Sequence, residues 1–295
     1  MPGQRYRVVH RTEYRYGATM IDGYSVACVL ARPTPSQTVA SSVVTTHPEP
    51  DEFDEREDVF GNRVVQFGLH RPHDGLVVEA ITEARVWELG LPRVDVGWER
   101  VAATVAGLRG PTALDVAPFI APSRFVTIDA NRTELSALAS ASFTPGRGVV
   151  EATTALCSGI FETYLFDPSS TEVSSPLDVV LGDRRGVCQD FAHLAVGALR
   201  TLGLAARYVS GYIETEPPPG EQKTIGADAS HAWCSVWVPD HGWLDFDPTN
   251  GIMAPSRHVT IGWGRDYADV APVRGVVVGP ASSQSLSVSV DVGRI

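Results

Sequence analysis

Alternating apolar and polar positions dominate the first third of the chain. These runs are rich in β-branched and aromatic residues and lie between clusters of Gly, Pro and Asp, a pattern typical of antiparallel strands. The acidic stretch 48–58 is interpreted as a solvated loop, and residues 1–90 as a β-rich module. The predicted strands of this module cover residues 6–16, 24–31, 38–46, 64–69 and 76–87.

Helical spacing replaces the strand pattern further along the chain. Residues 91–130 are weakly patterned and contain several prolines, so they are interpreted as a connector with one short helix near 101–108. From residue 131 onward, apolar positions recur at spacings of three and four, most clearly over residues 149–164. The change of period predicts a second structural unit, a core that extends over about residues 131–270.

The clearest helix of this core follows Gly186 and ends before Gly203. The chain is therefore predicted to be an α+β protein in which this helix packs on an antiparallel sheet. Residues 271–295 are expected to add a closing pair of strands. The predicted strands after the helix cover residues 206–213, 231–238, 243–246, 275–278 and 286–292.

Composition and charge narrow the classes of partner. The 295 residues carry a formal net charge of −11, which repels phosphate backbones and anionic headgroups, so neither nucleic acid nor membrane is expected as a partner. No apolar run approaches the roughly 20 residues that span a bilayer, and the N-terminus lacks the pattern of a secretory signal, so a cytoplasmic location is expected. The four cysteines show no paired short spacing, so no disulfide, metal or cofactor is predicted.

Cys188 differs from the other cysteines in its local setting. It falls in the first turn of the predicted helix, where unpaired amides and the helix dipole favour an anion and raise the thiolate fraction of a cysteine. The same amides could stabilise an oxyanion that forms nearby. Cys157 lies on an apolar helix stripe, and Cys28 and Cys234 lie in strands, so only Cys188 is interpreted as a nucleophile.

A cysteine nucleophile needs a base, and the base needs a group that orients it. His231 begins one predicted strand and Asp247 ends the next, with a short turn between them. A hairpin brings the start of one strand beside the end of the other, so these two residues are predicted to be neighbours at one end of a sheet. From spacing alone the structural alternative stays open, because a histidine at a strand start and an Asp-Pro turn are both common without catalysis.

Four motifs in this region resemble the bacterial transglutaminase-like family, which belongs to the papain-like superfamily of cysteine enzymes. Two flanking stretches, 10–16 with 58–62 and 264–270, are similar to the β-rich N-terminal region of this group and to the segment after its core. The resemblance thus covers nearly the whole chain. The four motifs, in family order, are residues 186–192, 206–212, 230–233 and 242–250.

The resemblance implies a papain-like transglutaminase core with Cys188 as nucleophile, His231 as general base and acid, and Asp247 as the orienting carboxylate. The implied chemistry is attack on a carboxamide or peptide carbonyl, giving a thioester that an amine or water resolves. Animal transglutaminases have Trp after the nucleophile, and their upstream oxyanion Trp has no counterpart in residues 149–160, so the backbone amide of Cys188 is the expected oxyanion donor. The residues expected to support or line the site are Gln189, Asp190, Tyr212 and Trp233.

Two functional classes remain open. The first is a peptidase, amidase or amide-transferring enzyme that acts on a peptide or protein amide, and the second is a catalytically silent binding or scaffold protein. The intact Cys, His and Asp favour the enzyme, and hydrolysis is favoured over transfer because no site for an acceptor amine is visible.

Other polar residues have structural interpretations. Asp190 and His193, three residues apart on the same helix, could form a metal pair, but local hydrogen bonding is favoured. His241 and His258 are expected to be solvated in a turn and a loop. Arg207, Tyr208 and residues 264–269 carry no evident bond-making group and are expected to line a cleft or brace the core.

Overall fold

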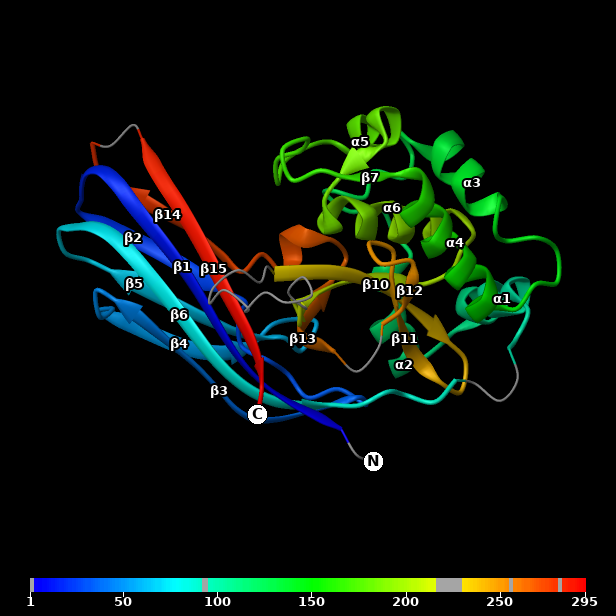
Figure 1. Cartoon of the computed structure of the whole chain (residues 1–295), viewed down its shortest axis with the longest axis horizontal. Helices are drawn as coiled ribbons and strands as arrows, with labels where there is room; N and C mark the ends of the chain where they lie inside the picture. The colour runs from blue at the N-terminus through cyan, green and yellow to red at the C-terminus, as the bar shows by residue number, and fades with distance from the viewer. Residues whose placement is uncertain (1–2, 92–94, 216–229, 255–256, 281–282) are drawn as a thin grey trace, which may run out of the picture.

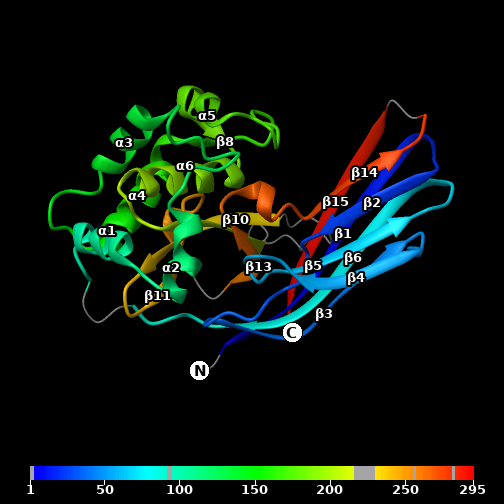
Figure 2. The same cartoon turned by 180° about the vertical axis from the view of Figure 1, so that it is seen from behind.

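The computed structural model of the chain describes residues 3–91, 95–215, 230–254, 257–280 and 283–295. Two views from opposite sides show a β-sandwich beside a core of helices and strands (Figures 1 and 2). Within the described ranges, no helix has the length and apolar character required to cross a bilayer.

The predicted β-rich module is a sandwich of two four-stranded antiparallel sheets. Its strands are β1 (Gln4–Met20), β2 (Asp22–Ala27), β3 (Gln37–His47), β4 (Glu52–Glu57), β5 (Arg63–Leu69), β6 (His73–Val86), β14 (Val273–Val278) and β15 (Gln284–Arg294). One sheet has the order β15-β1-β6-β3 and the other β14-β2-β5-β4. Alternate side chains point inward, as in β6, and side chains such as Phe67 and Val78 from the two sheets pack together between them.

One sequence prediction in this module is wrong. The acidic stretch contains the strand β4, which pairs with β5 along the sheet edge and exposes all six of its side chains. An edge strand without a buried face has no alternation to detect, and its charges discourage pairing with another chain. The two C-terminal strands are present, and each extends a different sheet, because β14 joins β2 and β15 joins β1.

The core is built on a five-stranded antiparallel sheet of order β12-β11-β10-β9-β13. Its strands are β9 (Ala206–Ile213), β10 (Ser230–Val238), β11 (Gly242–Asp247), β12 (Ile252–Met253) and β13 (His258–Gly264). The helices are α1 (Trp98–Gly107), α2 (Pro111–Val116), α3 (Arg132–Ser140), α4 (Val149–Thr163), α5 (Leu177–Asp183) and α6 (Cys188–Thr201). Short elements are η1 (Ala117–Phe119), η2 (Tyr267–Asp269) and a parallel pair of β7 (Leu165–Phe166) with β8 (Arg185–Gly186).

The predicted connector belongs to this core. Besides α1, which matches the predicted short helix, it forms α2 and η1. Val101, Val116 and Phe119 from this stretch are buried in the same cluster as residues of α4 and α6. Two of the prolines that weaken its sequence pattern lie at element starts. Pro111 opens α2, where its missing N–H costs nothing, and Pro118 lies in the first turn of η1.

The helix α6 occupies the centre of the core. It packs on β10 and β9, with α3, α4 and α5 against its other sides, so side chains from Gln189 to Arg200 are buried all around it. Gly203 follows with φ of 76°, the left-handed conformation that ends a helix and suits glycine. A helix enclosed in this way has little freedom to shift, and it fixes the position of Cys188 at its first turn.

Two buried amide side chains join the sandwich to the core sheet. Gln37 accepts from Thr260 N at 2.9 Å and donates to Thr260 O at 2.7 Å, and Asn62 makes the same pair of bonds with Trp263 at 2.9 and 2.8 Å. Asp58 holds Asn62 in turn, accepting from its side chain at 2.9 Å. These side chains satisfy backbone groups along the open edge of β13, which explains why the 58–62 motif accompanies this fold.

Candidate active site

Cys188 is the first residue of α6, as predicted. The helix start is held by Asp190, whose Oδ2 accepts from Val187 N at 2.9 Å and from Thr171 Oγ1 at 2.7 Å. A Cβ on Gly186 would lie 2.7 Å from the same carboxylate, so the approach requires glycine. Cys188 is partly exposed, whereas Cys28, Cys157 and Cys234 are buried. The accessible thiol therefore stands at the positive end of a well-anchored helix.

His231 lies between Cys188 and Asp247, at the start of β10 and beside the end of β11. Its Nε2 is 2.8 Å from Asp247 Oδ2, so the predicted juxtaposition across the hairpin is observed. Burial acts to lower the pKa of His231, but hydrogen bonds with Asp247 and Cys188 outweigh it and raise the pKa to about 10. An imidazolium that faces the sulfur stabilises a thiolate there.

Asp247 is fully buried and receives donors on both oxygens. Its Oδ1 accepts from the backbone N–H groups of Thr249 and Asn250 at 2.9 and 3.2 Å, and its Oδ2 also accepts from Asn250 Nδ2 at 2.6 Å. Burial alone would raise the pKa of Asp247, but its bonds with His231 and His258 hold it well below its usual range. The carboxylate stays ionised and fixes the ring of His231.

His258 is a site residue that the sequence analysis missed. It is the first residue of β13 and 5% exposed, so the prediction of a solvated loop histidine is wrong. Its Nε2 lies 2.8 Å from Asp247 Oδ2, the oxygen that also contacts His231. The fully buried Trp233 packs against both rings, stacked on His231 at 6.1 Å between centroids and edge-on to His258 at 5.0 Å.

A glycine makes room for this packing. Gly211 pairs with His231 across the strands, and a Cβ there would lie 2.6 Å from Trp233 Cη2 and 2.2 Å from Val259 O. The 206–212 motif thus places a residue without a side chain where the indole lies flat on the sheet. Trp233 supports the rings, as the sequence predicted in general terms.

The same three polar residues could also hold a metal ion. One ligand atom from each of His231, Asp247 and His258 lies within 4.8 Å of the others, and two imidazoles with a carboxylate are a common zinc set. Both nitrogen–oxygen distances are 2.8 Å, however, a hydrogen-bond length, and Asp247 Oδ2 already serves three donors. Hydrogen bonding accounts for the arrangement, and the expected absence of a metal stays a prediction.

The other predicted supporting residues have mixed outcomes. Gln189 donates to Val173 O at 3.0 Å, and Asp190 binds Thr171, so both tie the segment after β7 to the start of α6. Tyr212 does not present its hydroxyl to Cys188. Its hydroxyl is bonded to Nδ1 of the buried His10 at 2.7 Å, which joins the core to the sandwich.

Tyr208, which was expected to line a cleft or brace the core, packs beside Cys188. Its ring is 2% exposed and packs in a cluster that contacts Cys188, beside His193 at 5.0 Å between centroids. Burial raises the pKa of Tyr208 well above its usual value, with the neighbouring Cys188 adding to the effect, so the hydroxyl keeps its proton. No described residue forms a hydrogen bond with this hydroxyl.

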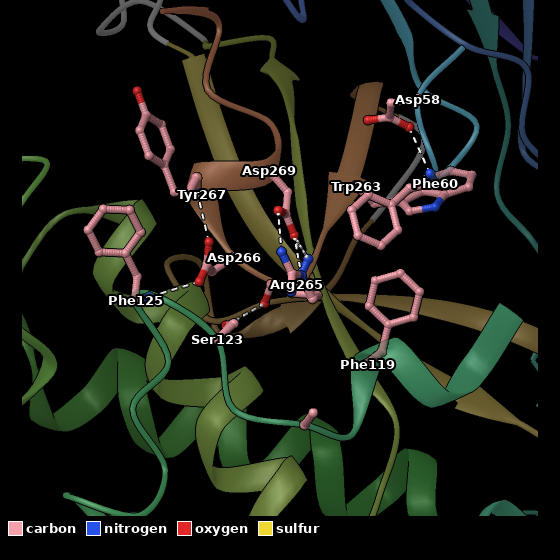
Figure 3. Close-up of polar contacts among 12 residues, drawn as sticks. Asp58, Phe60, Phe119, Ser123, Phe125, Trp263, Arg265, Asp266, Tyr267 and Asp269 are labelled. Atoms are coloured by element: carbon pink, nitrogen blue, oxygen red, sulfur yellow. Dashed lines mark hydrogen bonds and ion pairs between the residues drawn. The ribbon is translucent and has the colours of Figure 1, made fainter. Parts of the chain in front are cut away.

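The Asp190–His193 metal pair is not formed. His193 Nε2 accepts from Tyr267 N at 3.2 Å, and its ring stacks on Phe125, whereas Asp190 has its own partners. The 264–270 segment braces the core, as Figure 3 shows: Asp266 accepts from Phe125 N at 2.8 Å, and Arg265 pairs with Asp269 at 2.9 Å. His241 is exposed in its turn, as predicted.

Sequence comparisons agree with this arrangement. Residues 137–248 match the family model of the transglutaminase-like superfamily, and residues 6–85 match the bacterial transglutaminase-like N-terminal region. An uncharacterized protein of Mycobacterium tuberculosis is 38% identical over 98% of this chain and 92% of its own length. Another, from Mycobacterium leprae, is 32% identical over 99% of both. The Protein-glutamine gamma-glutamyltransferase of Pseudomonas aeruginosa is 35% identical over 32% of this chain but only 14% of its own length.

The fold has a solved counterpart. A crystal structure from Cytophaga hutchinsonii, named "Putative Cysteine Protease", matches with a TM-score of 0.75 at 22% identity, covering 100% of this chain and 92% of that one. At this identity the likeness concerns the fold. With a sandwich and a helix-on-sheet core that each match their own family model, the chain belongs to the bacterial transglutaminase-like family.

Proposed function

We propose that this protein is a cysteine enzyme that cleaves or transfers an amide bond through a thioester on Cys188. The observation that carries the proposal is the position of His231, which is hydrogen-bonded to Asp247 at 2.8 Å and lies near enough to Cys188, at the first turn of α6, for that side chain to help raise the pKa of the imidazole. Nucleophile, base and orienting carboxylate are then in the order that the chemistry requires.

The proposed reaction begins with a thiolate on Cys188 beside a protonated His231. The thiolate adds to the carbonyl carbon, a C–S bond forms, and the carbonyl electrons move to oxygen. When the C–N bond breaks, His231 gives its proton to the leaving nitrogen, and a thioester remains. Water or an amine then loses a proton to His231 as it attacks the thioester, which frees the product and returns the thiolate with the imidazolium.

Oxyanion stabilisation falls to two groups in this proposal. The backbone N–H of Cys188 belongs to the first helical turn, where amides have no intrahelical acceptor. The Tyr208 hydroxyl is a protonated donor beside Cys188 and has no described partner. Two donors of this kind act on the charge that develops in the transition state, which is where they contribute most.

The substrate class is proposed as a peptide or protein amide, with hydrolysis as the main outcome. The partial match to a glutamine γ-glutamyltransferase favours a second candidate, acyl transfer from a glutamine side chain to an amine. Incubation of the protein with glutamine-containing peptides, with and without a primary amine, separates the two. Hydrolysis gives free acid in both reactions, and transfer gives an amine adduct at the expense of the acid.

The experiment that tests the nucleophile needs no known substrate. Iodoacetamide should alkylate Cys188 rapidly below pH 7, because the imidazolium of His231 stabilises the thiolate there. A His231→Gln variant keeps a side chain of similar polarity without the charge, and its alkylation below pH 7 should become slow. Equal rates in the two proteins at every pH would remove the ion pair from the proposal, and a silent scaffold would then explain the fold better.

A further inference from the structure

A cavity of about 500 Å³ lies outside the triad, between the sandwich and the sheet face opposite α6. Its walls come from the stretches 32–36 and 59–61 of the sandwich, from 114–119, and from the three strands β9, β11 and β13. None of Cys188, His231 and Asp247 is among the residues that line it. The cavity is therefore a site separate from the triad.

Aromatic and guanidinium groups alternate along this cavity. The guanidinium carbon of Arg207 lies 3.6 Å from the ring of Trp263 and 4.4 Å from that of Trp243. The guanidinium of Arg32 lies 3.4 Å from Trp263, and two such groups cannot occupy the same face of one indole. The order is accordingly Trp243, Arg207, Trp263, Arg32. Stacking holds the plane of Arg207 while leaving its N–H groups at the plane's edge free to bind.

Three buried polar groups near this stack have no hydrogen-bond partner among the residues that the structure describes. Arg207 is 7% exposed, and no described residue accepts a hydrogen bond from its guanidinium or pairs with it within 4.0 Å. Ser235 Oγ and Asp245 Oδ1 are likewise buried without a partner. Burial lowers the pKa of Arg207 to about 9, and the charge of Asp245 opposes this, so the side chain stays protonated at neutral pH.

Strand register places these three groups in one row. Arg207 of β9 pairs with Ser235 of β10, and Ser235 pairs with Asp245 of β11. Residues paired in this way point to the same face of the sheet, and the outer two stand about 10 Å apart at the backbone. Arg207 and Asp245 thus lie on either side of Ser235, too far apart to form an ion pair, and both of these charged residues line the cavity.

The guanidinium of Arg207 and the carboxylate of Asp245 together favour a ligand that carries one negative and one positive charge. A simple anion would satisfy Arg207 but would meet the carboxylate of Asp245, and a simple cation would meet the guanidinium. A zwitterion satisfies both, with a planar carboxylate on the fork of Arg207 and an ammonium on Asp245. Phe60, Phe119 and Trp263, grouped together in Figure 3, supply an apolar wall for a side chain.

We propose that this cavity binds a free α-amino acid with an apolar side chain, its carboxylate on Arg207 and its ammonium on Asp245. The side chain lies against the aromatic wall. The cavity is large enough for such a molecule, whose binding also gives a partner to Arg207 and to Asp245, the two charged groups that line it.

Calorimetric titration of the full chain with L-phenylalanine tests the proposal. The Cys188→Ala background is used so that no probe can be turned over. Two matched probes each remove one charge: N-acetyl-L-phenylalanine lacks the ammonium, and L-phenylalaninamide lacks the carboxylate. Each should bind at least about tenfold more weakly than L-phenylalanine, the effect of losing one charged hydrogen bond.

Three variants locate the binding. Arg207→Met should weaken the binding of L-phenylalanine by about tenfold or more. Arg100→Gln, on the exposed face of α1, also removes one positive charge and should leave the affinity unchanged. Asp245→Asn removes the partner proposed for the ammonium, so this variant should bind L-phenylalanine and its N-acetyl form with equal affinity. This measurement tests the proposal even if Arg207→Met does not fold. The proposal is overturned if L-phenylalanine shows no saturable binding at millimolar concentration or if the three probes bind with equal affinity. It is also overturned if substitutions of Arg207 and of Asp245 both leave the affinity unchanged.

Discussion

Replacing Asp247 by Asn tests how the structure holds its catalytic histidine. The carboxylate faces donors on both sides: two backbone N–H groups at Oδ1, and Asn250 Nδ2 with the two histidines at Oδ2. An asparagine has only one oxygen, so its amide group must face donors in either orientation. If the amide faces His231, the ring must accept at Nε2 and carry its proton on Nδ1. The tautomer is then wrong for taking a proton from Cys188.

The size of the effect follows from the electrostatics of the pair. The pKa of His231 lies at about 10 instead of 6.5, which is roughly 5 kcal/mol in favour of the imidazolium. Asp247 and Cys188 share this stabilisation, and burial opposes it. Loss of the charged hydrogen bond to Asp247 alone removes about 1.5–3 kcal/mol, which is between about tenfold and 150-fold. We therefore expect Asp247→Asn to slow alkylation of Cys188 at pH 6 by roughly 100-fold.

The assay is the second-order rate of iodoacetamide labelling across pH, read by peptide mapping at Cys188. Asp178→Asn, an exposed carboxylate on α5, is the matched control and should label like the native protein. Thermal melts of both variants exclude unfolding as the cause. The reasoning is refuted if folded Asp247→Asn labels at the native rate with the native pH profile.

Three further predictions rest on the same network. His258→Ala should slow labelling of Cys188 by about tenfold, because Asp247 loses one hydrogen-bond donor and is held less firmly, and labelling at the native rate would show that His258 does not support the site. The free energy of unfolding should fall as pH rises from 6.5 toward 10, because the stabilisation from the raised pKa of His231 is complete below pH 6.5 and is lost when the imidazole deprotonates. In urea titrations of His231→Gln, the decrease in unfolding free energy that is due to His231 should be absent. Treatment with a strong zinc chelator should leave turnover unchanged, whereas loss restored by zinc would show that His231, Asp247 and His258 hold a metal.

Local pattern was enough to predict the elements that carry Cys188, His231 and Asp247. The helix start after Gly186 and its stop at Gly203 are encoded within the segment itself, and β9 matches its predicted range because it is an interior strand whose residues are all buried. His231 and Asp247 are only 16 residues apart and share one hairpin, so their contact follows from a short turn. Information that lies within one supersecondary unit can be obtained from the sequence alone.

Contacts set by the order of strands in the sheet could not be predicted in this way. His258 reaches Asp247 because β13 pairs with the far side of β9, and nothing near His258 specifies that register. The same holds for the hydroxyl of Tyr212, which His10 of the first strand engages from 202 residues away. The strand β4 was not predicted for a different reason: all of its side chains are exposed, so its sequence shows no alternation of apolar and polar residues.

The central claim is that Cys188 forms a thioester with an amide substrate. Its most direct test is incubation of native protein with a library of peptides and primary amides, followed by acid quenching and mass mapping of the protein. The account predicts that at least one member is cleaved, that its acyl group is found on Cys188, and that Cys188→Ala shows neither cleavage nor adduct. Cleavage by Cys188→Ala at the native rate, or a library left wholly intact by the folded native protein, would contradict it.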